Sequence, residues 1–329
     1  MSHPNRERVA ELSVFVSYSH AQAPWVRTRL VPCLKAGGVE VRIDVERFRA
    51  GIAVYKQMDA EQDACDKHLL VLSDEYLASG PCRHEMNRAI ARDPAFDGGT
   101  IIPVRRTPCT LPPGIAIPNP LYIDLTDDGQ SAAWERLLTD CGASLGVSPS
   151  KWISARDSLY RIMVDGRSAN LICNDEANWK YLIENSEDIA RQSGAFISPV
   201  VAIDFHDPRT SSLSDFINLL NFATKANTGS ININKRKLSD LYHSLDGCED
   251  HYFIFTSYHM TMIRGKSGFD ADFYGALRYL VQEVRKMKTI IHSNTPLASI
   301  APLNYPGSPF DIATIDLRMG NRNGKSSFE

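Results

Sequence analysis

The sequence lacks several features of membrane-embedded, secreted and nucleic-acid-coating proteins. It has no run approaching the ~20 consecutive apolar residues that a membrane-spanning helix needs. Its formal net charge is -3, from 36 Lys and Arg against 39 Asp and Glu, so bulk positive charge cannot hold it to nucleic acid. The first residues, MSHPNRERVAEL, are polar and lack the apolar stretch of a secretory signal. We therefore expect a chain that neither enters a membrane nor binds nucleic acid directly.

Paired cysteines are also missing. The 7 cysteines are an odd number, and none are spaced as CxxC, so the pattern fits neither a zinc knuckle nor a disulfide framework. We expect reduced thiols in a cytoplasmic protein, with no metal site and no bound cofactor.

The length and composition predict two ordinary globular domains. The chain has 329 residues, of which 43% are hydrophobic and 23% are charged, and domains usually span roughly 100–200 residues. The stretch GASLGVSPSKW at 142–152 is rich in Gly, Ser and Pro, which is typical of a linker. We place the domains at 1–148 and 149–329.

The first part alternates between short apolar runs and segments with helical periodicity, which predicts an α/β fold with a doubly wound parallel sheet. The expected strands cover residues 12–17, 39–43, 68–72, 100–104 and 121–125. The expected helices cover residues 25–34, 54–64, 82–91 and 132–145. In open parallel sheets, ligands bind beyond the carboxyl ends of the strands. The residues at these strand ends bring hydroxyl groups, one carboxylate and arginines to one rim of the sheet, which predicts a polar ligand site there.

Three ordered segments carry a family resemblance: FVSYSH at 15–20, RIDVERFRAG at 42–51 and LLVLSDEYLASGPCRHE at 69–85. With them, residues 12–146 resemble a TIR domain (Toll/interleukin-1 receptor homology). The resemblance implies a flavodoxin-like fold with five parallel strands, a BB loop at 44–51 and a catalytic glutamate at Glu85. One position departs from the family, because Pro81 stands where many members have tryptophan.

The resemblance to the NAD-cleaving members implies that NAD+ is the substrate and that Glu85 acts on it. Nicotinamide leaves as a neutral molecule from a cationic pyridinium, so the step needs no general acid. Positive charge develops on the ribose, and an anion beneath it stabilises the transition state more than the ground state. The ordinary alternative for Glu85 is a solvated carboxylate on a helix surface.

The resemblance also suggests which residues contact NAD+. They are Ser19, His20 and Cys82 and, in the BB loop, Asp44, Arg47, Phe48 and Gly51. Each has an ordinary alternative: Cys82 is favoured as a core thiol, His20 can be a plain loop residue, and the BB-loop residues can serve solubility or a turn. Phe48 is a large apolar residue in a charged loop, which favours burial against a partner or ligand.

Three residues near this site have structural roles that compete with a role in binding. Ser79 is expected to cap the helix that carries Glu85. Trp25 and Tyr55 could stack on a ring of the substrate, but core packing is the favoured role for both.

The second part has its own α/β pattern. The expected strands cover residues 168–173, 200–205, 251–256, 288–291 and 312–317, and the expected helices cover 178–191, 213–226, 235–244 and 270–287. The order of elements resembles a P-loop ATPase core of the signal-transducing (STAND) type, but the chemistry of that fold is missing. CNDEANWKY at 173–181 replaces the glycine-rich phosphate loop, and SYHM at 257–260 replaces an acidic pair. We expect a module without Walker motifs that senses or binds a partner.

One group in this second part has side chains suited to a metal. Asp204, His206 and Asp207 could be ligands, but a capped turn at the end of a strand is the favoured interpretation.

The resemblance, taken with these features, implies a TIR-domain NAD+ glycohydrolase effector of bacterial (anti-phage) immunity. It would act on assembly through TIR–TIR contacts between copies, with a sensor or activator protein bound to its C-terminal domain. Two alternatives remain open: an enzyme that makes a cyclic ADP-ribose-type signal, and a non-enzymatic TIR adaptor.

Overall fold

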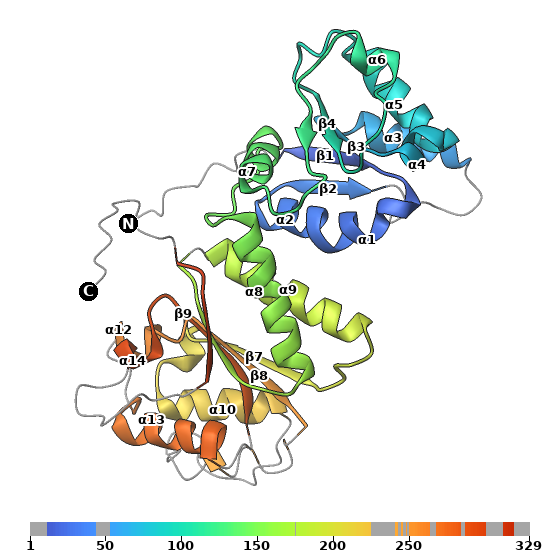
Figure 1. Cartoon of the computed structure of the whole chain (residues 1–329). Helices are drawn as coiled ribbons and strands as arrows, with labels where there is room; N and C mark the ends of the chain where they lie inside the picture. The colour runs from blue at the N-terminus through green and yellow to red at the C-terminus, as the bar shows by residue number, and fades with distance from the viewer. Residues whose placement is uncertain are drawn as a thin grey trace, which may run out of the picture. The chain divides into compact units, whose positions relative to one another are not determined.

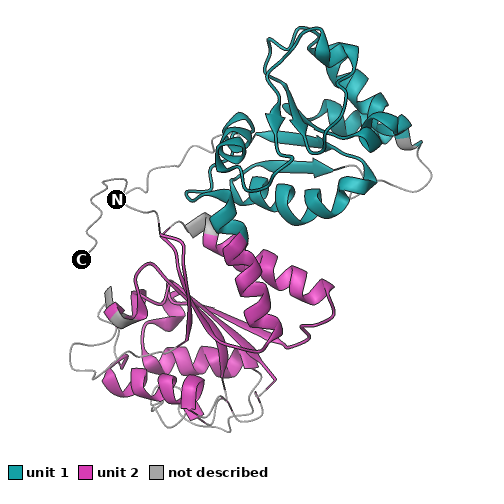
Figure 2. Ribbon diagram, viewed as in Figure 1, with its two compact units in different colours: residues 1–153 teal, residues 154–329 magenta. Residues whose placement is uncertain are grey.

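The chain folds into two compact units, residues 1–153 and residues 154–329 (Figure 2). The structure is a computed structural model, and it describes residues 12–43, 53–174, 176–224, 241–242, 245, 248, 250–263, 268–283, 287–300 and 312–318. The division falls inside helix α8 (Pro149–Val164). The boundary expected after residue 148 stays a prediction.

The first unit is built on a sheet of five parallel strands in the order β2-β1-β3-β4-β5, which confirms the expected α/β class. The strands are β1 (Ser13–Ser17), β2 (Glu40–Ile43), β3 (Lys67–Leu72), β4 (Ile101–Arg105) and β5 (Ile123–Asp124). Every residue of β1 is buried, as expected of an interior parallel strand that is covered on both faces.

Helices cover both faces of this sheet (Figure 1). One face carries a helical segment made of α1 (Ala23–Trp25), η2 (Val26–Leu30) and α2 (Val31–Ala36), together with α7 (Ser131–Asp140). The other carries α3 (Val54–Asp63), α4 (Asp74–Ala78) and α5 (Gly80–Arg92). Two short elements, η1 (His20–Gln22) and α6 (Pro113–Ala116), lie in connections. The rings of Trp25 and Trp134 are 5.8 Å apart and join α1 to α7.

The sequence of α5 explains which way Glu85 faces. Cys82, Met86 and Ala89 recur at helical spacing and are buried in a core cluster with residues of β3 and β4. Because Glu85 lies three residues after Cys82 and four before Ala89, it shares this inward face and is turned toward the sheet.

The second unit has a second sheet of five parallel strands, in the order β10-β6-β9-β8-β7. The strands are β6 (Ala169–Ile172), β7 (Val200–Asp204), β8 (Tyr252–Thr256), β9 (Lys288–Ser293) and β10 (Ala313–Asp316). Helices α8 and α9 (Glu176–Gln192) cover one face, and α10 (Leu213–Thr224) and α13 (Ala271–Arg278) cover the other (Figure 1). The remaining elements are η3 (Pro208–Thr210), α12 (Met260–Ile263), η5 (Tyr279–Glu283) and α14 (Leu297–Ile300).

Aromatic side chains fill the core of this second unit. Phe205 packs against Phe216 at 5.4 Å and against Phe255 at 6.0 Å between ring centroids, and Phe273 of α13 reaches the same cluster. Among the described residues, no helix is both long and apolar enough to cross a bilayer. The seven cysteines all lie within the described ranges, and none of them forms a disulfide.

Candidate functional site

The helix that carries Glu85 begins with a capped turn. The hydroxyl of Ser79 accepts a hydrogen bond from the backbone N–H of Cys82 at 3.4 Å, which confirms the expected capping role. Pro81 lies in the first turn and is exposed, at a position where a proline needs no backbone donor. The departure from the family pattern at this residue therefore leaves the start of the helix intact.

Glu85 is buried, with only 3% of its surface exposed. This excludes the solvated surface carboxylate that was the ordinary alternative. The hydroxyl of Ser17, the last residue of β1, donates a hydrogen bond to Glu85 Oε2. The phenol oxygen of Tyr76 lies 2.8 Å from Ser17 Oγ. A carboxylate and two hydroxyls thus meet under the surface at the carboxyl end of β1.

The directions of these two hydrogen bonds follow from the proton count. A serine hydroxyl has one proton, and Ser17 uses it toward the carboxylate of Glu85. The bond between Ser17 and Tyr76 must then be donated by the phenol. Burial, followed by the nearby charge of Glu85, raises the pKa of Tyr76 well above its usual value, so the phenol keeps this proton. The three groups form a directed chain from Tyr76 through Ser17 to Glu85.

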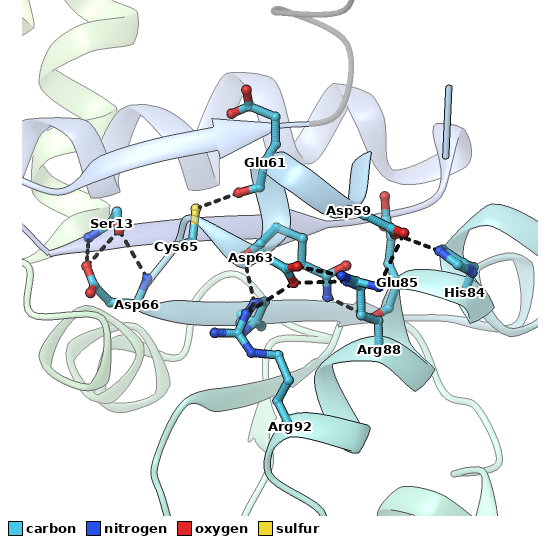
Figure 3. Close-up of polar contacts among 12 residues, drawn as sticks. Ser13, Asp59, Glu61, Asp63, Cys65, Asp66, His84, Glu85, Arg88 and Arg92 are labelled. Atoms are coloured by element: carbon cyan, nitrogen blue, oxygen red, sulfur yellow. Dashed lines mark hydrogen bonds and ion pairs between the residues drawn. The ribbon is translucent and has the colours of Figure 1, made fainter. Parts of the chain in front are cut away.

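Polar contacts fix helix α5 to helix α3 on both sides of Glu85. The side-chain amide of Gln62 donates to the backbone carbonyl of Glu85 at 2.8 Å. His84 pairs with Asp59 at 2.8 Å, and Arg88 pairs with the same carboxyl group at 3.2 Å (Figure 3).

Further along the two helices, Asp63 accepts from Arg88 and also lies 3.6 Å from Arg92 (Figure 3). The hydrogen bonds from Arg88 lower the pKa of Asp63. The side chains of these pairs are about one-third to one-half exposed, so each pair stabilises the fold only slightly. Together with the Gln62 amide they set the position of the helix that carries Glu85.

The structure brings three of the other expected contact residues to the same strand end. Cys82 is buried, and its thiol donates to the backbone carbonyl of Tyr18 at 3.5 Å, as a core thiol would. Ser19 is 5% exposed, and its hydroxyl has no hydrogen-bond partner among the described residues. His20 opens η1 and is exposed. Their contact with NAD+ stays a prediction.

The expected BB-loop residues cannot be placed. Asp44, Arg47, Phe48 and Gly51 lie outside the described residues, and their contact with NAD+ also stays a prediction.

Two residues that could have stacked on a substrate ring have different surroundings. Trp25 is buried, its indole N–H donates to Asp128 at 2.7 Å, and the guanidinium of Arg106 lies 4.9 Å from the centre of its ring. Core packing of Trp25 is therefore confirmed. Tyr55 is 50% exposed and meets the ring of His84 edge-on at 5.0 Å, so the expectation that it packs in the core is wrong.

Sequence reasoning placed Ser17 and Tyr76 only in the general group of polar residues at the strand ends, and it gave Gln62 no role. Ser17 ends β1 and Tyr76 follows β3, and that position was the available signal. Their contacts with Glu85 depend on how distant segments pair. Ser17 and Glu85 are 68 residues apart in the sequence, and no local pattern reports such a contact.

At the carboxyl end of the second sheet, a buried histidine joins neighbouring strand ends. The ring of His292, at the end of β9, stacks on Trp179 with centroids 4.0 Å apart. Its Nδ1 accepts from the backbone N–H of Ser257 at 3.1 Å, so its Nε2 carries the proton and donates to the backbone carbonyl of Cys173 at 3.1 Å. Burial lowers the pKa of His292 to about 4, so the ring is neutral near pH 7.

The acidic and histidine side chains after β7 form turns. Asp207 accepts from the backbone N–H of Arg209 at 2.8 Å and caps η3. Asp204 accepts from the backbone N–H of His206 at 3.0 Å. Within the described ranges, no group of three or more His, Cys, Asp or Glu side chains could hold a metal ion. The capped turn is the role that the structure shows.

Comparison with known proteins identifies the first unit. Residues 14–138 match the family model described as TIR domain. No curated protein matches the chain.

Among solved structures, the TIR domain of a Toll-related receptor from Hydra magnipapillata is 19% identical, with a TM-score of 0.35, and covers 39% of this chain and 96% of that one. A Walker-type ATPase from Pyrococcus abyssi is 11% identical, with a TM-score of 0.36, and covers 51% of this chain and 53% of that one. A hypothetical protein from Thermus thermophilus is 10% identical, with a TM-score of 0.29, and covers 75% of this chain and 59% of that one.

At these identities and scores, the solved structures say nothing about the chemistry of this chain. The family match, the ordered motifs and the sheet order rest on the same residues. This chain therefore contains a TIR domain, at residues 14–138.

Proposed function

We propose that the TIR domain is a NAD+ glycohydrolase that breaks the bond between nicotinamide and ribose, with Glu85 as its catalytic carboxylate. One observation carries the proposal. The glutamate that the family motif marks is buried at the carboxyl end of β1, and a hydroxyl donates to its carboxylate. A buried carboxylate at this end of a parallel sheet is typical of a functional group rather than of a surface residue.

The chemistry asks little of the protein beyond this one anion. The bond between C1 of the ribose and the pyridinium nitrogen breaks, and both bonding electrons leave with nicotinamide. The ribose is left with an oxocarbenium-like positive charge, which the carboxylate of Glu85 stabilises until water adds to C1. The proton released by that water goes to solvent. The products are nicotinamide and ADP-ribose.

The burial of Glu85 also bears on when the enzyme acts. With 3% of Glu85 exposed, a ribose cannot reach its carboxylate until the groups that cover it move. We propose that this movement occurs when copies assemble through TIR–TIR contacts, and that the BB loop of a neighbouring copy, with Asp44, Arg47, Phe48 and Gly51, completes the site. The lone protein would then turn over NAD+ slowly.

The decisive experiment follows nicotinamide release from NAD+ by the full chain, first alone and then held in clusters by a fused oligomerising tag. Glu85→Gln, which removes the charge and keeps the shape, should lower the rate in the clustered protein by roughly 10²–10³-fold. Glu135→Gln, at an exposed glutamate of α7, is the matched control and should leave the rate unchanged. Equal rates for Glu85→Gln and the wild type would contradict the proposal.

The burial of Glu85 supports a second candidate, a TIR adaptor without activity, because a covered carboxylate held by Ser17 can also serve the fold alone. An adaptor would assemble and leave NAD+ intact, and Glu85→Gln would lower its stability. The remaining alternative is an enzyme that makes a cyclic ADP-ribose-type signal. Mass spectrometry of the products distinguishes it from a glycohydrolase, because cyclic ADP-ribose is lighter than linear ADP-ribose by one water.

The cellular role is proposed on the same basis. We place the protein in the cytoplasm, as an effector of bacterial anti-phage immunity whose second unit binds a sensor or activator protein. In infected cells, NAD+ should fall with the wild-type chain and stay constant with Glu85→Gln. If NAD+ stays constant in infected cells with either chain, the immune role is contradicted. The activity in vitro is tested separately by the nicotinamide-release experiment.

A further inference from the structure

The directed hydrogen-bond chain points to two residues beyond Glu85 that serve the proposed reaction. We propose that Ser17 and Tyr76 are positioning residues, which hold the carboxylate of Glu85 ionised and in one orientation beneath the reacting ribose. This inference rests on the proposed function for its chemical meaning. The hydrogen-bond chain itself is a property of the protein and can be tested without turnover.

The first step of the argument is the cost of burying a charge. An ionised carboxylate removed from water is stable only where hydrogen-bond donors replace the lost solvent. Glu85 is 3% exposed, and Ser17, which is 1% exposed, donates to its Oε2 atom. A hydrogen bond to the charged form of an acid favours ionisation, so Ser17 keeps the carboxylate available as an anion.

The second step concerns the serine itself. Its hydroxyl can rotate, and a free rotor could give its proton to another acceptor. Tyr76 prevents this, because its phenol lies 2.8 Å from Ser17 Oγ and its own proton stays in place. A donated proton from Tyr76 occupies a lone pair of Ser17 and polarises its O–H bond toward Glu85. The phenol therefore acts on the carboxylate through the serine.

The third step is that local structure fixes both hydroxyls. Ser17 ends β1, where its backbone pairs with Leu70 of β3. Tyr76 is fully buried in α4, and its backbone N–H donates to the capping hydroxyl of Ser73 at 3.1 Å. The ionisable groups whose charges act on the Tyr76 phenol are Glu85 and Cys82. The chain thus joins three elements, β1, α4 and α5, at one point.

The test compares pH profiles of nicotinamide release by the clustered full chain. Glu85 must be ionised to stabilise the ribose cation, so the rate falls as the pH drops through its titration. Losing the direct donor in Ser17→Ala should move this acid limb upward by about one to two pH units. Tyr76→Phe should move it in the same direction by less, and Ser17→Thr, which keeps a hydroxyl, should restore it.

The matched control is Tyr274→Phe in the second unit. It removes a buried phenol that bonds the hydroxyl of Thr261 at 2.7 Å, and it should not move the acid limb. A purely structural role for Ser17 or Tyr76 would lower the rate equally at every pH. An unmoved acid limb in both Ser17→Ala and Tyr76→Phe would overturn the proposal.

A second readout needs no activity. The carboxyl carbon of Glu85 can be followed by NMR in full-length protein carrying labelled glutamate, with the signal assigned by its absence in Glu85→Gln. Its titration midpoint should rise in Ser17→Ala and Tyr76→Phe, and not in Tyr274→Phe. If wild-type protein leaves NAD+ intact while the midpoint moves, the proposed function fails and the hydrogen-bond chain stands. If NAD+ is cleaved but the midpoint does not move, the positioning role fails alone.

Discussion

The two units use the same kind of sheet and treat its carboxyl end in opposite ways. In the TIR domain, the carboxylate of Glu85 lies there, the hydroxyl of Ser17 donates to it, and the phenol of Tyr76 donates to Ser17. In the second unit, a neutral imidazole lies there, stacked on Trp179 and bonded to two neighbouring strand ends. The first arrangement buries a carboxylate that accepts a hydrogen bond from a hydroxyl, whereas the second uses both ring nitrogens of His292 to join neighbouring strand ends. The topology alone therefore does not predict a reaction.

The largest expected effect on stability comes from removing the ring of Trp179, which stacks on His292 in the second unit. Trp179 is 7% exposed, and Trp179→Ala should lower the free energy of unfolding of the second unit by about 3–5 kcal/mol. Trp179→Phe retains a ring for His292 and should cost less. Urea unfolding followed by circular dichroism measures both. We expect the contact between Trp179 and His292 to stabilise the second unit without serving the reaction proposed for the TIR domain. Trp179→Ala protein that remains folded and is held in clusters should therefore cleave NAD+ at the wild-type rate.

The next effect is the pH dependence that His292 gives the second unit. Burial lowers its pKa from 6.5 to about 4, so the unfolded chain takes up a proton at a higher pH than the folded chain. Stability is therefore full above about pH 6.5, falls as the pH drops to about 4, and is constant below that. The loss should be roughly 3 kcal/mol.

His292→Asn is the control for this prediction, because its amide mimics Nδ1 and does not titrate. Its unfolding free energy should depend less on pH between 6.5 and 4 than that of the wild type. Parallel curves for the two proteins would show that the histidine is not the titrating group.

A smaller effect is expected at the start of the helix that carries Glu85. Ser79→Ala removes the cap of α5 and should lower the stability of the TIR domain by about 1 kcal/mol. Ser79→Asp keeps an acceptor at this position and should retain most of that stability. Thermal unfolding of the three proteins at pH 7 decides the matter, and an unchanged midpoint in Ser79→Ala would show that the cap contributes nothing.

The smallest expected effect is the change in stability of the second unit when magnesium and ATP are added. A ligand at 100 times its Kd stabilises a protein by about 2.7 kcal/mol. Because the segment after β6 reads Cys173-Asn174-Asp175 before α9 begins, with no glycine to let the backbone wrap a phosphate, magnesium and ATP at about 1 mM should leave the unfolding midpoint unchanged. A clear upward shift would show that this strand end binds nucleotide after all.

The sequence predicted the sheets well because parallel strands that are buried on both faces read as short apolar runs. Every expected strand is present, most within one or two residues of its expected bounds. The expected helix at 235–244 falls largely outside the described residues. The long helix expected at 270–287 is instead α13 followed by the wider turn η5.

The main omission was α8, the helix at Pro149–Val164. Its proline and serines read as part of a linker, although Pro149 is the first residue of the helix, where proline is well tolerated. A signal was available in the apolar residues Trp152, Leu159 and Met163, which are all buried and recur at helical spacing. The position of Glu85 could be anticipated from its motif, but its burial and its partner Ser17 depend on strand pairing, which the sequence does not display.

The amide of Gln62 offers a physical probe of the candidate site. Its side chain is fully buried, and one of its N–H groups is committed to the carbonyl of Glu85. These protons should exchange with deuterium slowly while α3 and α5 remain in contact. If copies of the protein open the site when they gather, the exchange of this single amide should accelerate, and it would time the opening independently of any product.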